Sequence, residues 1–363
     1  MKALLLGDMS PTKDIDPIFA KGDKTALFDD TLELFSGNDI NFVNLECAIT
    51  ESETGIEKFG PCLKACPNTA KVLKEVGVTV CGLSNNHIFD FGKAGAIDTM
   101  AYLDKVGIDY TGFGENYEDS RKNYVVNKDG EKITIIAVCE HEYSYAIDDR
   151  MGARPYDEYD TMADIRSAKA ESDRVIVIYH GGKEHCRYPS PRLRKLCRAM
   201  GDNGADVVLC QHSHCIGCYE DYNGCHILYG QGNYHFVFAN PESVPATWDG
   251  SLAVKYDTKT NEIEFTPIVN TATGITIAKG ERAEEMMREF AERNETLKDG
   301  SWIEGWREFC YRMQRQYYNA TQSAAGVPFE KVGGTIFAHY IDCEAHSDVW
   351  RELFKTANHR NEK

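Results

Sequence analysis

Short apolar runs alternate with amphipathic stretches along the first two-thirds of the chain. The runs are rich in β-branched residues, which is typical of buried strands. They predict strands at Lys2–Leu6, Ile40–Leu45, Val78–Leu83, Ile133–Val138, Arg174–Tyr179, Ala205–Cys210 and His226–Tyr229. The stretches between them predict helices at Lys24–Phe35, Asn68–Val76, Lys93–Val106, Met162–Glu171 and Pro191–Asn203. Strand–helix alternation of this kind predicts an α/β fold, in which helices cover a sheet.

The pattern changes toward the C-terminus. Ser251–Tyr256 and Glu262–Ile268 predict a β-hairpin that closes the α/β region. After about residue 275, Glu281–Leu297 and Trp302–Tyr318 predict helices. We therefore expect an α/β domain at residues 1–274 and a helical extension at residues 275–363 that packs on it.

The second of these helices carries an aromatic face. Apolar residues recur at three- and four-residue steps, at Trp302, Trp306, Phe309, Met313 and Tyr317. Such a face is usually buried against the rest of the fold, and we adopt that interpretation. The alternatives are an aromatic lid or partner surface, and a dimerisation role for the helices from residue 281 onward.

Acidic residues outnumber basic ones in this chain. There are 40 Lys and Arg against 57 Asp and Glu, so the formal net charge is −17. Such a surface repels nucleic acid, and we expect no nucleic-acid partner. An anionic substrate, small or oligomeric, has to meet a local basic patch or a bound cation. Basic residues gather near residues 183–195, and a solvated helix face explains most of them. Lys183 and Arg187 of this group, and Lys64 after the second motif, are candidates for binding the substrate.

The apolar and cysteine patterns favour a cytoplasmic protein without membrane insertion. The apolar run after Met1 is too short for a signal peptide, and no stretch of about 18 apolar residues predicts a membrane span. The 13 cysteines, an odd number, are scattered through predicted strands, which is typical of reduced thiols. Cys210, Cys215 and Cys218 imitate an iron–sulfur spacing, but we interpret them as small apolar core residues.

Polar side chains with catalytic or metal-binding chemistry collect where five predicted strands end. They are Asp8; Asn44 and Glu46; Asn85, Asn86, His87 and Asp90; His180 and Glu184; and His212 and His214. Ligands of open α/β sheets bind outside the carboxyl ends of the strands, so we expect these groups to converge. Each alone has an ordinary explanation as a turn residue or a buried histidine. The ordered set is much stronger evidence than its parts.

The donors in this set favour one class of metal. Carboxylates, an amide oxygen and neutral imidazoles together suit divalent ions such as Mn²⁺, Fe²⁺ or Zn²⁺. A carboxylate such as Glu46 can bridge two ions about 3.5–4 Å apart, an arrangement that activates water. We therefore expect one or two divalent metal ions.

These motifs resemble those of the capsule-synthesis CapA family, which is associated with poly-γ-glutamate synthesis and is similar in fold to calcineurin-like metallophosphoesterases. The matching pieces occur in the family's order over roughly residues 1–270, as Gly7-Asp8, Asn44-Leu45-Glu46, Asn85–Gly92, His180–Glu184, Gly204-Ala205-Asp206 with His212-Ser213-His214, and Tyr229–Asn233. The resemblance implies a four-layer sandwich, two mixed sheets flanked by helices, with the site at one edge of the sheets.

The resemblance also implies roles for individual residues. One metal is held by Glu46, Asn86, His180 and His212, and the other by Asp8, Glu46 and His214. His87 stands beside the metals as a proton donor or transition-state stabiliser, and Asp90 orients it. Glu184 is an acid that faces the ligands or the substrate, and Asn233 helps to close the site.

The complete set predicts a metal-dependent hydrolase in which metal-activated water attacks a phosphoester or a γ-glutamyl amide. The alternative is a non-catalytic accessory protein that binds an anionic polymer or a synthase partner in poly-γ-glutamate synthesis. The first motif favours this alternative, because Asp8-Met9-Ser10 lacks the histidine usual in metallophosphoesterases. In the fourth motif Gly181 replaces the usual tryptophan, which predicts extra room or a missing wall.

Overall fold

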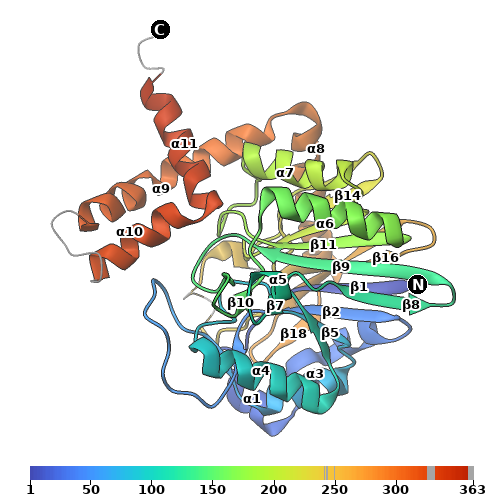
Figure 1. The fold of residues 1–363 in the computed structure, drawn as a ribbon. Helices are drawn as coiled ribbons and strands as arrows, with labels where there is room; N and C mark the ends of the chain where they lie inside the picture. The colour runs from blue at the N-terminus through green and yellow to red at the C-terminus, as the bar shows by residue number, and fades with distance from the viewer. Residues whose placement is uncertain (241, 243, 249, 325–331, 359–363) are drawn as a thin grey trace.

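Two mixed β-sheets lie face to face at the centre of the molecule, and helices cover the outer side of each (Figure 1). The computed structural model describes residues 1–240, 242, 244–248, 250–324 and 332–358. The first sheet has the strand order β18-β17-β16-β1-β2-β5-β6, with β15 beside β1. The second sheet has the order β13-β14-β12-β11-β9-β8. In the first sheet β1, β2, β5 and β6 run parallel, and antiparallel strands join them on the β16 side only. In the second sheet the central strands run parallel, and an antiparallel strand joins them at each edge.

The strands of the first sheet are β1 (Lys2–Met9), β2 (Ile40–Leu45), β5 (Val80–Gly82), β6 (Asp109–Thr111), β15 (Asn233–His235), β16 (Ser251–Asp257), β17 (Glu262–Asn270) and β18 (Ile275–Ile277). Those of the second sheet are β8 (Tyr124–Lys128), β9 (Glu131–Cys139), β11 (Arg174–His180), β12 (Val207–Gln211), β13 (Tyr219–Tyr222) and β14 (Cys225–Leu228). Two short strand pairs lie outside the sheets, β3 (Ala48–Ile49) with β4 (Lys64–Ala65) and β7 (Phe113–Gly114) with β10 (Gly152–Ala153).

The helices are α1 (Asp16–Lys21), α2 (Lys24–Phe28), α3 (Asn68–Val76), α4 (Gly92–Val106), α5 (Tyr117–Ser120), α6 (Glu158–Glu171), α7 (Pro191–Asp202), α8 (Gly280–Asp299), α9 (Trp302–Ala324), α10 (Val332–Asp342) and α11 (Glu344–Asn358). Two 3₁₀ helices, η1 (Asp29–Phe35) and η3 (Ala246–Trp248), complete the described elements used below.

Alternation along the strands builds the layers. In β1, Leu4 packs toward α1, α3 and α4, whereas Leu5 packs toward the second sheet. In β11, Ile176 faces the first sheet, whereas Val177 packs toward α6 and α7. Successive side chains of a strand point to opposite faces, so each apolar strand contributes to two layers. The result is the four-layer sandwich that the motif resemblance implied.

The helix predicted at Lys24–Phe35 is wrong in its second half. The α-helix α2 ends at Phe28, and the 3₁₀ helix η1 follows it. Asp29 takes a left-handed φ of 40°, which interrupts the α-helical path. Asp30 then accepts hydrogen bonds of 2.8 Å from the Thr276 hydroxyl and the Ile277 N–H. Docking against β18 therefore overrides the local helical pattern.

The C-terminal helices pack in two places. The helix α8 buries Met286 and Phe290 in the apolar layer between the sheets. The aromatic face of α9 is also buried, because Trp306, Phe309 and Tyr317 pack with α10 and α11, two helices that the sequence pattern did not predict. Figure 1 shows α9, α10 and α11 together at one end of the molecule. The first sheet itself continues through β18, past residue 274.

No helix in the described part of the chain combines the length and the apolar character that crossing a bilayer requires.

The strands that carry the predicted site end at one edge of the sheets. Asp8 of β1 stands opposite Asn44 of β2, and His180 is the last residue of β11. The register between β1 and β2 shifts just before Asp8. Gly7 allows the β1 backbone to approach the backbone at Gly232 closely, since a Cβ atom on Gly7 would lie 2.3 Å from the carbonyl oxygen of Gly232.

Candidate metal centre

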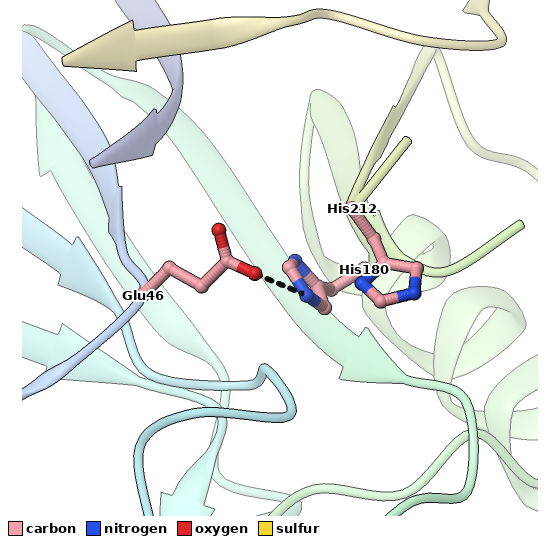
Figure 2. Close-up of side chains that lie close together, drawn as sticks. All are labelled: Glu46, His180 and His212. Atoms are coloured by element: carbon pink, nitrogen blue, oxygen red, sulfur yellow. Dashed lines mark ion pairs between the residues drawn. The ribbon is translucent and has the colours of Figure 1, made fainter. Parts of the chain in front are cut away.

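Both sheets contribute side chains to one buried cluster. Glu46 follows β2 of the first sheet, whereas His180 ends β11 and His212 follows β12 of the second. Figure 2 shows the Glu46 carboxylate directed at the His180 ring, with the His212 ring beside it. All three side chains are buried, and the two imidazole centroids are 4.9 Å apart.

The ligand atoms form two overlapping groups. Glu46, His180 and His212 offer atoms that all lie within 4.8 Å of one another, and so do Asp8, Glu46 and His214. Glu46 belongs to both groups. Asn86 lies beside these groups, with its Oδ1 2.9 Å from His180 Nε2. With Asn86, the structure brings together six side chains predicted from five strand ends.

The Glu46 carboxylate is the strongest indication of a cation. It is completely buried, and neither oxygen has a hydrogen-bond partner. Its nearest charged neighbour is His180, whose Nε2 lies 3.3 Å from Oε1. The Nδ1 atom of His212 is likewise buried without a partner. Because burying an unsatisfied carboxylate costs several kcal/mol, these residues fit a bound metal ion much better than they fit an ion-free core.

Asp8 is fixed by the groups around it. Its Oδ1 accepts a hydrogen bond of 2.7 Å from Asn44 Nδ2, and its Oδ2 accepts one of 2.8 Å from the His212 N–H. Burial alone would raise the pKa of Asp8, but His180, His214 and Asn44 outweigh it and lower the pKa to about 2. Asp8 is therefore an ionised and positioned donor.

His180 joins the two acids. Burial lowers its pKa, but the Glu46 and Asp8 carboxylates outweigh burial and raise it to about 10. Without a metal, His180 therefore carries a proton at neutral pH. Since a histidine coordinates metal as the neutral imidazole, an incoming cation has to displace that proton.

The two histidines after β12 owe their directions to an unusual backbone. His212 has a φ of 79° and His214 a φ of 57°, both left-handed. Strain of this kind costs on the order of 1–3 kcal/mol for each residue and concentrates at functional sites. The Oδ1 atom of Asn233 lies 2.8 Å from His214 Nδ1, and the Trp248 ring lies 4.3 Å from the His214 ring. Asn233, predicted to close the site, therefore holds a predicted ligand.

His87 forms a separate buried network with Asp90. Its Nδ1 lies 2.6 Å from Asp90 Oδ2, so the predicted partners are in contact. Lys58, which no sequence pattern indicated, joins this network, and its Nζ lies 2.5 Å from Asp90 Oδ1 and 3.2 Å from His87 Nδ1. Both contacts are on Nδ1, which leaves Nε2 as the nitrogen available to a substrate.

The Lys58–Asp90 pair yields a prediction about stability. The two side chains are 2% and 0% exposed, so Asp90→Asn leaves the Lys58 ammonium buried without its counter-charge. We expect this change to lower the free energy of unfolding by about 3–5 kcal/mol, measured by urea denaturation. Glu53→Gln, which breaks the exposed Lys64–Glu53 pair, is the control and should leave the midpoint unchanged. Equal midpoints for Asp90→Asn and the unmodified protein would contradict this account.

The three candidate basic residues lie in different surroundings. Lys64 donates to Glu53 and to the Ser52 carbonyl oxygen, both at 2.7 Å, and Arg187 pairs with Glu289 of α8 at 3.1 Å. Lys183 is buried, and its Nζ lies 4.0 Å from Glu184 Oε2.

Glu184 lies between Lys183 and the ligands. Its Oε1 is 4.0 Å from His212 Nε2. Burial opposes its ionisation, but Lys183 and then His212 lower the pKa of Glu184 well below its usual range. Of the three basic candidates, Lys183 is thus the one whose charge reaches the metal-ligand cluster.

Glu142 is an acid of this site that the sequence analysis missed. Its Oε2 accepts a hydrogen bond of 3.0 Å from Asn86 Nδ2, and its Oε1 lies 3.9 Å from His212 Nε2. Burial, followed by the charge on Glu184, raises the pKa of Glu142 to about 7. Glu142 lies in a loop after β9, where no repeated spacing could have indicated it.

The replacement of a family tryptophan by Gly181 does not create the expected space. A Cβ atom at Gly181 would lie 2.6 Å from Cγ of Glu140 and 2.7 Å from Cε1 of Tyr179. Glu140 fills this position and accepts hydrogen bonds from the Tyr179 hydroxyl at 2.6 Å and from Arg192 at 2.7 Å. The expectation of extra room was therefore wrong.

The cysteines that imitate an iron–sulfur spacing are buried free thiols. Cys210 Sγ lies 3.5 Å from Cys197 Sγ, and Cys218 donates to the Arg187 carbonyl oxygen. Among the described residues, no candidate metal-ligand group contains Cys210, Cys215 or Cys218.

The fold and the cluster define an α/β sandwich with a carboxylate shared by two groups of metal-binding side chains. Residues 2–239 match the family described as bacterial capsule synthesis protein PGA_cap, and the chain belongs to this family. This match confirms the resemblance seen in the motifs. The PGA biosynthesis protein CapA of Bacillus subtilis (strain 168) is 29% identical over 287 residues, which cover 77% of this chain and 74% of the relative. The capsule biosynthesis protein CapA of Bacillus anthracis is 32% identical over 180 residues, 48% of this chain and 44% of the relative.

Solved structures are similar at a lower level. A hypothetical protein from Thermus thermophilus has a TM-score of 0.46 and 13% identity, covering 77% of this chain and 100% of that one. A provisionally assigned 5′-nucleotidase from Staphylococcus aureus has a TM-score of 0.43 and 11% identity, covering 80% of this chain and 58% of that one.

Proposed function

We propose that the protein is a metal-dependent hydrolase that acts on an anionic substrate of poly-γ-glutamate or capsule synthesis, at a phosphoester or a γ-glutamyl amide. The Glu46 carboxylate carries the proposal, because it is buried, lacks a hydrogen-bond partner on both oxygens and belongs to both ligand groups. The names of the Bacillus relatives, which refer to PGA and capsule biosynthesis, support the substrate class.

The ligand groups suggest how the ions would be held. Glu46, Asn86, His180 and His212 would hold one ion, and Asp8, Glu46 and His214 the other. Divalent ions held there supply Lewis acidity and lower the pKa of water toward neutrality. Gly7 permits a close approach of two backbone segments, and His212 and His214 have left-handed backbone angles. Both features would hold the metal-binding side chains in place before an ion binds.

Two other side chains complete the proposed chemistry. His87, held through Nδ1 by Asp90 and Lys58, would present Nε2 to the leaving group and donate a proton to it. Lys183 would hold an anionic group of the substrate, because its ammonium has only the Glu184 carboxylate, 4.0 Å away, as an ion-pair partner among the described residues. Glu184 would keep the Lys183 side chain directed toward the ligands.

A non-catalytic accessory role is the second candidate, and the first motif favours it. Ser10 takes the place of a histidine, and its hydroxyl is buried without a hydrogen-bond partner. The Asp8 group therefore has a single imidazole, His214, and should hold its ion more weakly than the His180 group does.

Metal removal separates the two candidates. We expect chelation to abolish hydrolysis of a generic phosphodiester or of γ-linked glutamate oligomers, and Mn²⁺ to restore it. His180→Ala should lower both metal content and turnover, whereas His226→Gln should change neither, because His226 lies near the opposite end of the second sheet. Full metal occupancy without turnover of either substrate class would favour the accessory role. A metal content that His180→Ala leaves unchanged would overturn the hydrolase, because that proposal needs an ion on His180.

A further inference from the structure

A cysteine between α10 and α11 and a histidine in the first turn of α11 lie at the edge of the candidate metal centre. Glu142, Cys343 and His346 offer ligand atoms that all lie within 4.8 Å of one another. Cys343 and His346 are each 2% exposed, and Glu142 is 9% exposed. We propose that these three residues form an additional metal site, which takes a thiolate-binding divalent ion such as Zn²⁺. The proposal does not depend on hydrolysis by the neighbouring centre.

The donor set explains the choice of ion. A cysteine thiolate, an imidazole and a carboxylate are the ligands that Zn²⁺ prefers, and Mn²⁺ is a poor match for sulfur. Neither of the two groups around Glu46 contains a cysteine. The additional site therefore has a different metal preference from its neighbours. Three protein ligands also leave a fourth position of a tetrahedral ion open for water or substrate.

Two of the three ligands are already oriented by neighbours. The Tyr317 hydroxyl lies 2.7 Å from His346 Nδ1, which leaves Nε2 as the nitrogen available to a metal ion. The Oε2 atom of Glu142 accepts a hydrogen bond of 3.0 Å from Asn86, which leaves Oε1. Hydrogen bonds of this kind fix the ring direction and raise the basicity of a ligand.

The turn that carries Cys343 is anchored to the α/β sandwich. The Ala345 N–H donates to Glu140 Oε2 at 3.1 Å, and Glu344 pairs with His141 at 2.8 Å. In the first turns of α11, Asp348 accepts a hydrogen bond of 2.6 Å from the Ser190 hydroxyl. These contacts hold Cys343 and His346 in place, so little ordering is needed when an ion binds.

The charges around the site are compatible with a divalent ion. Burial, followed by Glu140, raises the pKa of the Cys343 thiol well above its usual range, so binding has to release a proton. Once that proton has left, the negative charges of the Cys343 thiolate and the Glu142 carboxylate together balance the charge of a divalent ion. Lys183 is a positive charge that acts on Cys343, and the Glu184 carboxylate lies 4.0 Å from the Lys183 ammonium.

The site is linked to the metal centre through one residue. Asn86 donates to Glu142 through Nδ2, and its Oδ1 lies 2.9 Å from His180 Nε2. An ion on Glu142 would therefore help to fix the amide of a predicted ligand of the first group. Cys343 and His346 lie outside residues 2–239, the part that matches the family, whereas Glu142 lies within it.

Cobalt substitution tests the proposal, because a cysteine thiolate bound to Co²⁺ gives a near-ultraviolet charge-transfer band that imidazole and carboxylate ligands do not give. The metal-free full chain is titrated with Co²⁺ at neutral pH. We expect the band to appear in the unmodified protein, to vanish in Cys343→Ser and to persist in Cys310→Ser, a buried cysteine of α9 outside the candidate groups. Tyr317→Phe keeps all three ligands and should weaken binding roughly 10–100-fold.

The outcomes decide whether Cys343 belongs to a metal site. Loss of the band in Cys343→Ser, with weaker binding in Tyr317→Phe, supports the site even if one of the two variants folds poorly. A Co²⁺-saturated protein without the band would overturn it, and so would a band that survives in Cys343→Ser. Hydrolytic activity does not enter the measurement, so failure here leaves the proposed hydrolase untouched.

Discussion

Glu46→Gln is expected to remove at once both ions that we propose for the candidate metal centre, whereas His212→Ala and His214→Ala should each remove one. The reason is that Glu46 is the only residue shared by the two ligand groups identified among the described residues around it. The glutamine amide is neutral, and its nitrogen is a hydrogen-bond donor. It therefore cannot replace the carboxylate that both ligand groups share. Metal content after Mn²⁺ loading is the measurement, since Mn²⁺ disfavours the thiolate of Cys343.

Hydrolysis should fall with the metal in the same variants. Lewis acidity supplies several kcal/mol to a reaction of this kind, so we expect Glu46→Gln to reduce turnover roughly 100-fold or more. Glu75→Gln, which changes an acid on the surface of α3, is the control and should retain metal and activity. If Glu46→Gln kept two ions, the shared-carboxylate account would be wrong.

Lys183→Met is expected to weaken substrate binding with little change in metal content. The ammonium is buried near the ligands, so it should contact an anionic group directly, and a hydrogen bond to a charged group contributes about 1.5–3 kcal/mol. We therefore expect KM for an anionic substrate to rise roughly 10–100-fold. Methionine keeps the length and the apolar stem of the side chain. Steady-state kinetics at several salt concentrations measure the effect.

Lys64→Met is the matched control. Lys64 is already paired with Glu53 and with the Ser52 carbonyl oxygen, and its removal should leave KM unchanged. A rise in KM for Lys64→Met that equals the rise for Lys183→Met would show that the two lysines act as a general basic surface. An unchanged KM for Lys183→Met would remove Lys183 from the substrate site.

The buried parallel strands were the part of the fold most readily predicted from sequence. Strands such as β11 are apolar on both faces because each contributes to two layers, and this makes the stretch Val175–Tyr179 stand out as a continuous run. Their carboxyl ends then locate Asp8, Glu46, His180 and His212 without knowledge of the sheet order. The structure brings these four side chains together because parallel strands end at one edge.

The missed features depend on contacts between distant segments. The helix after Lys24 fails at Asp29 because Asp30 docks on β18, almost 250 residues later, as the hydrogen bonds to Thr276 and Ile277 show. Lys58 reaches Asp90 from a loop with no regular pattern.

The C-terminal contribution to the site was missed for a similar reason. Cys343 and His346 follow a Cys-x2-His spacing that is a usable metal signal, but its third member, Glu142, is about 200 residues away. The local pattern of apolar residues predicts which segments are buried. The partners of a buried charge depend instead on how the sheets and helices pack against one another.

Anomalous diffraction from crystals grown with Mn²⁺ tests the central claim most directly. The account predicts two anomalous peaks on either side of the Glu46 carboxylate, one beside His180 and His212 and the other beside Asp8 and His214. A map without a peak in contact with Glu46 would contradict it.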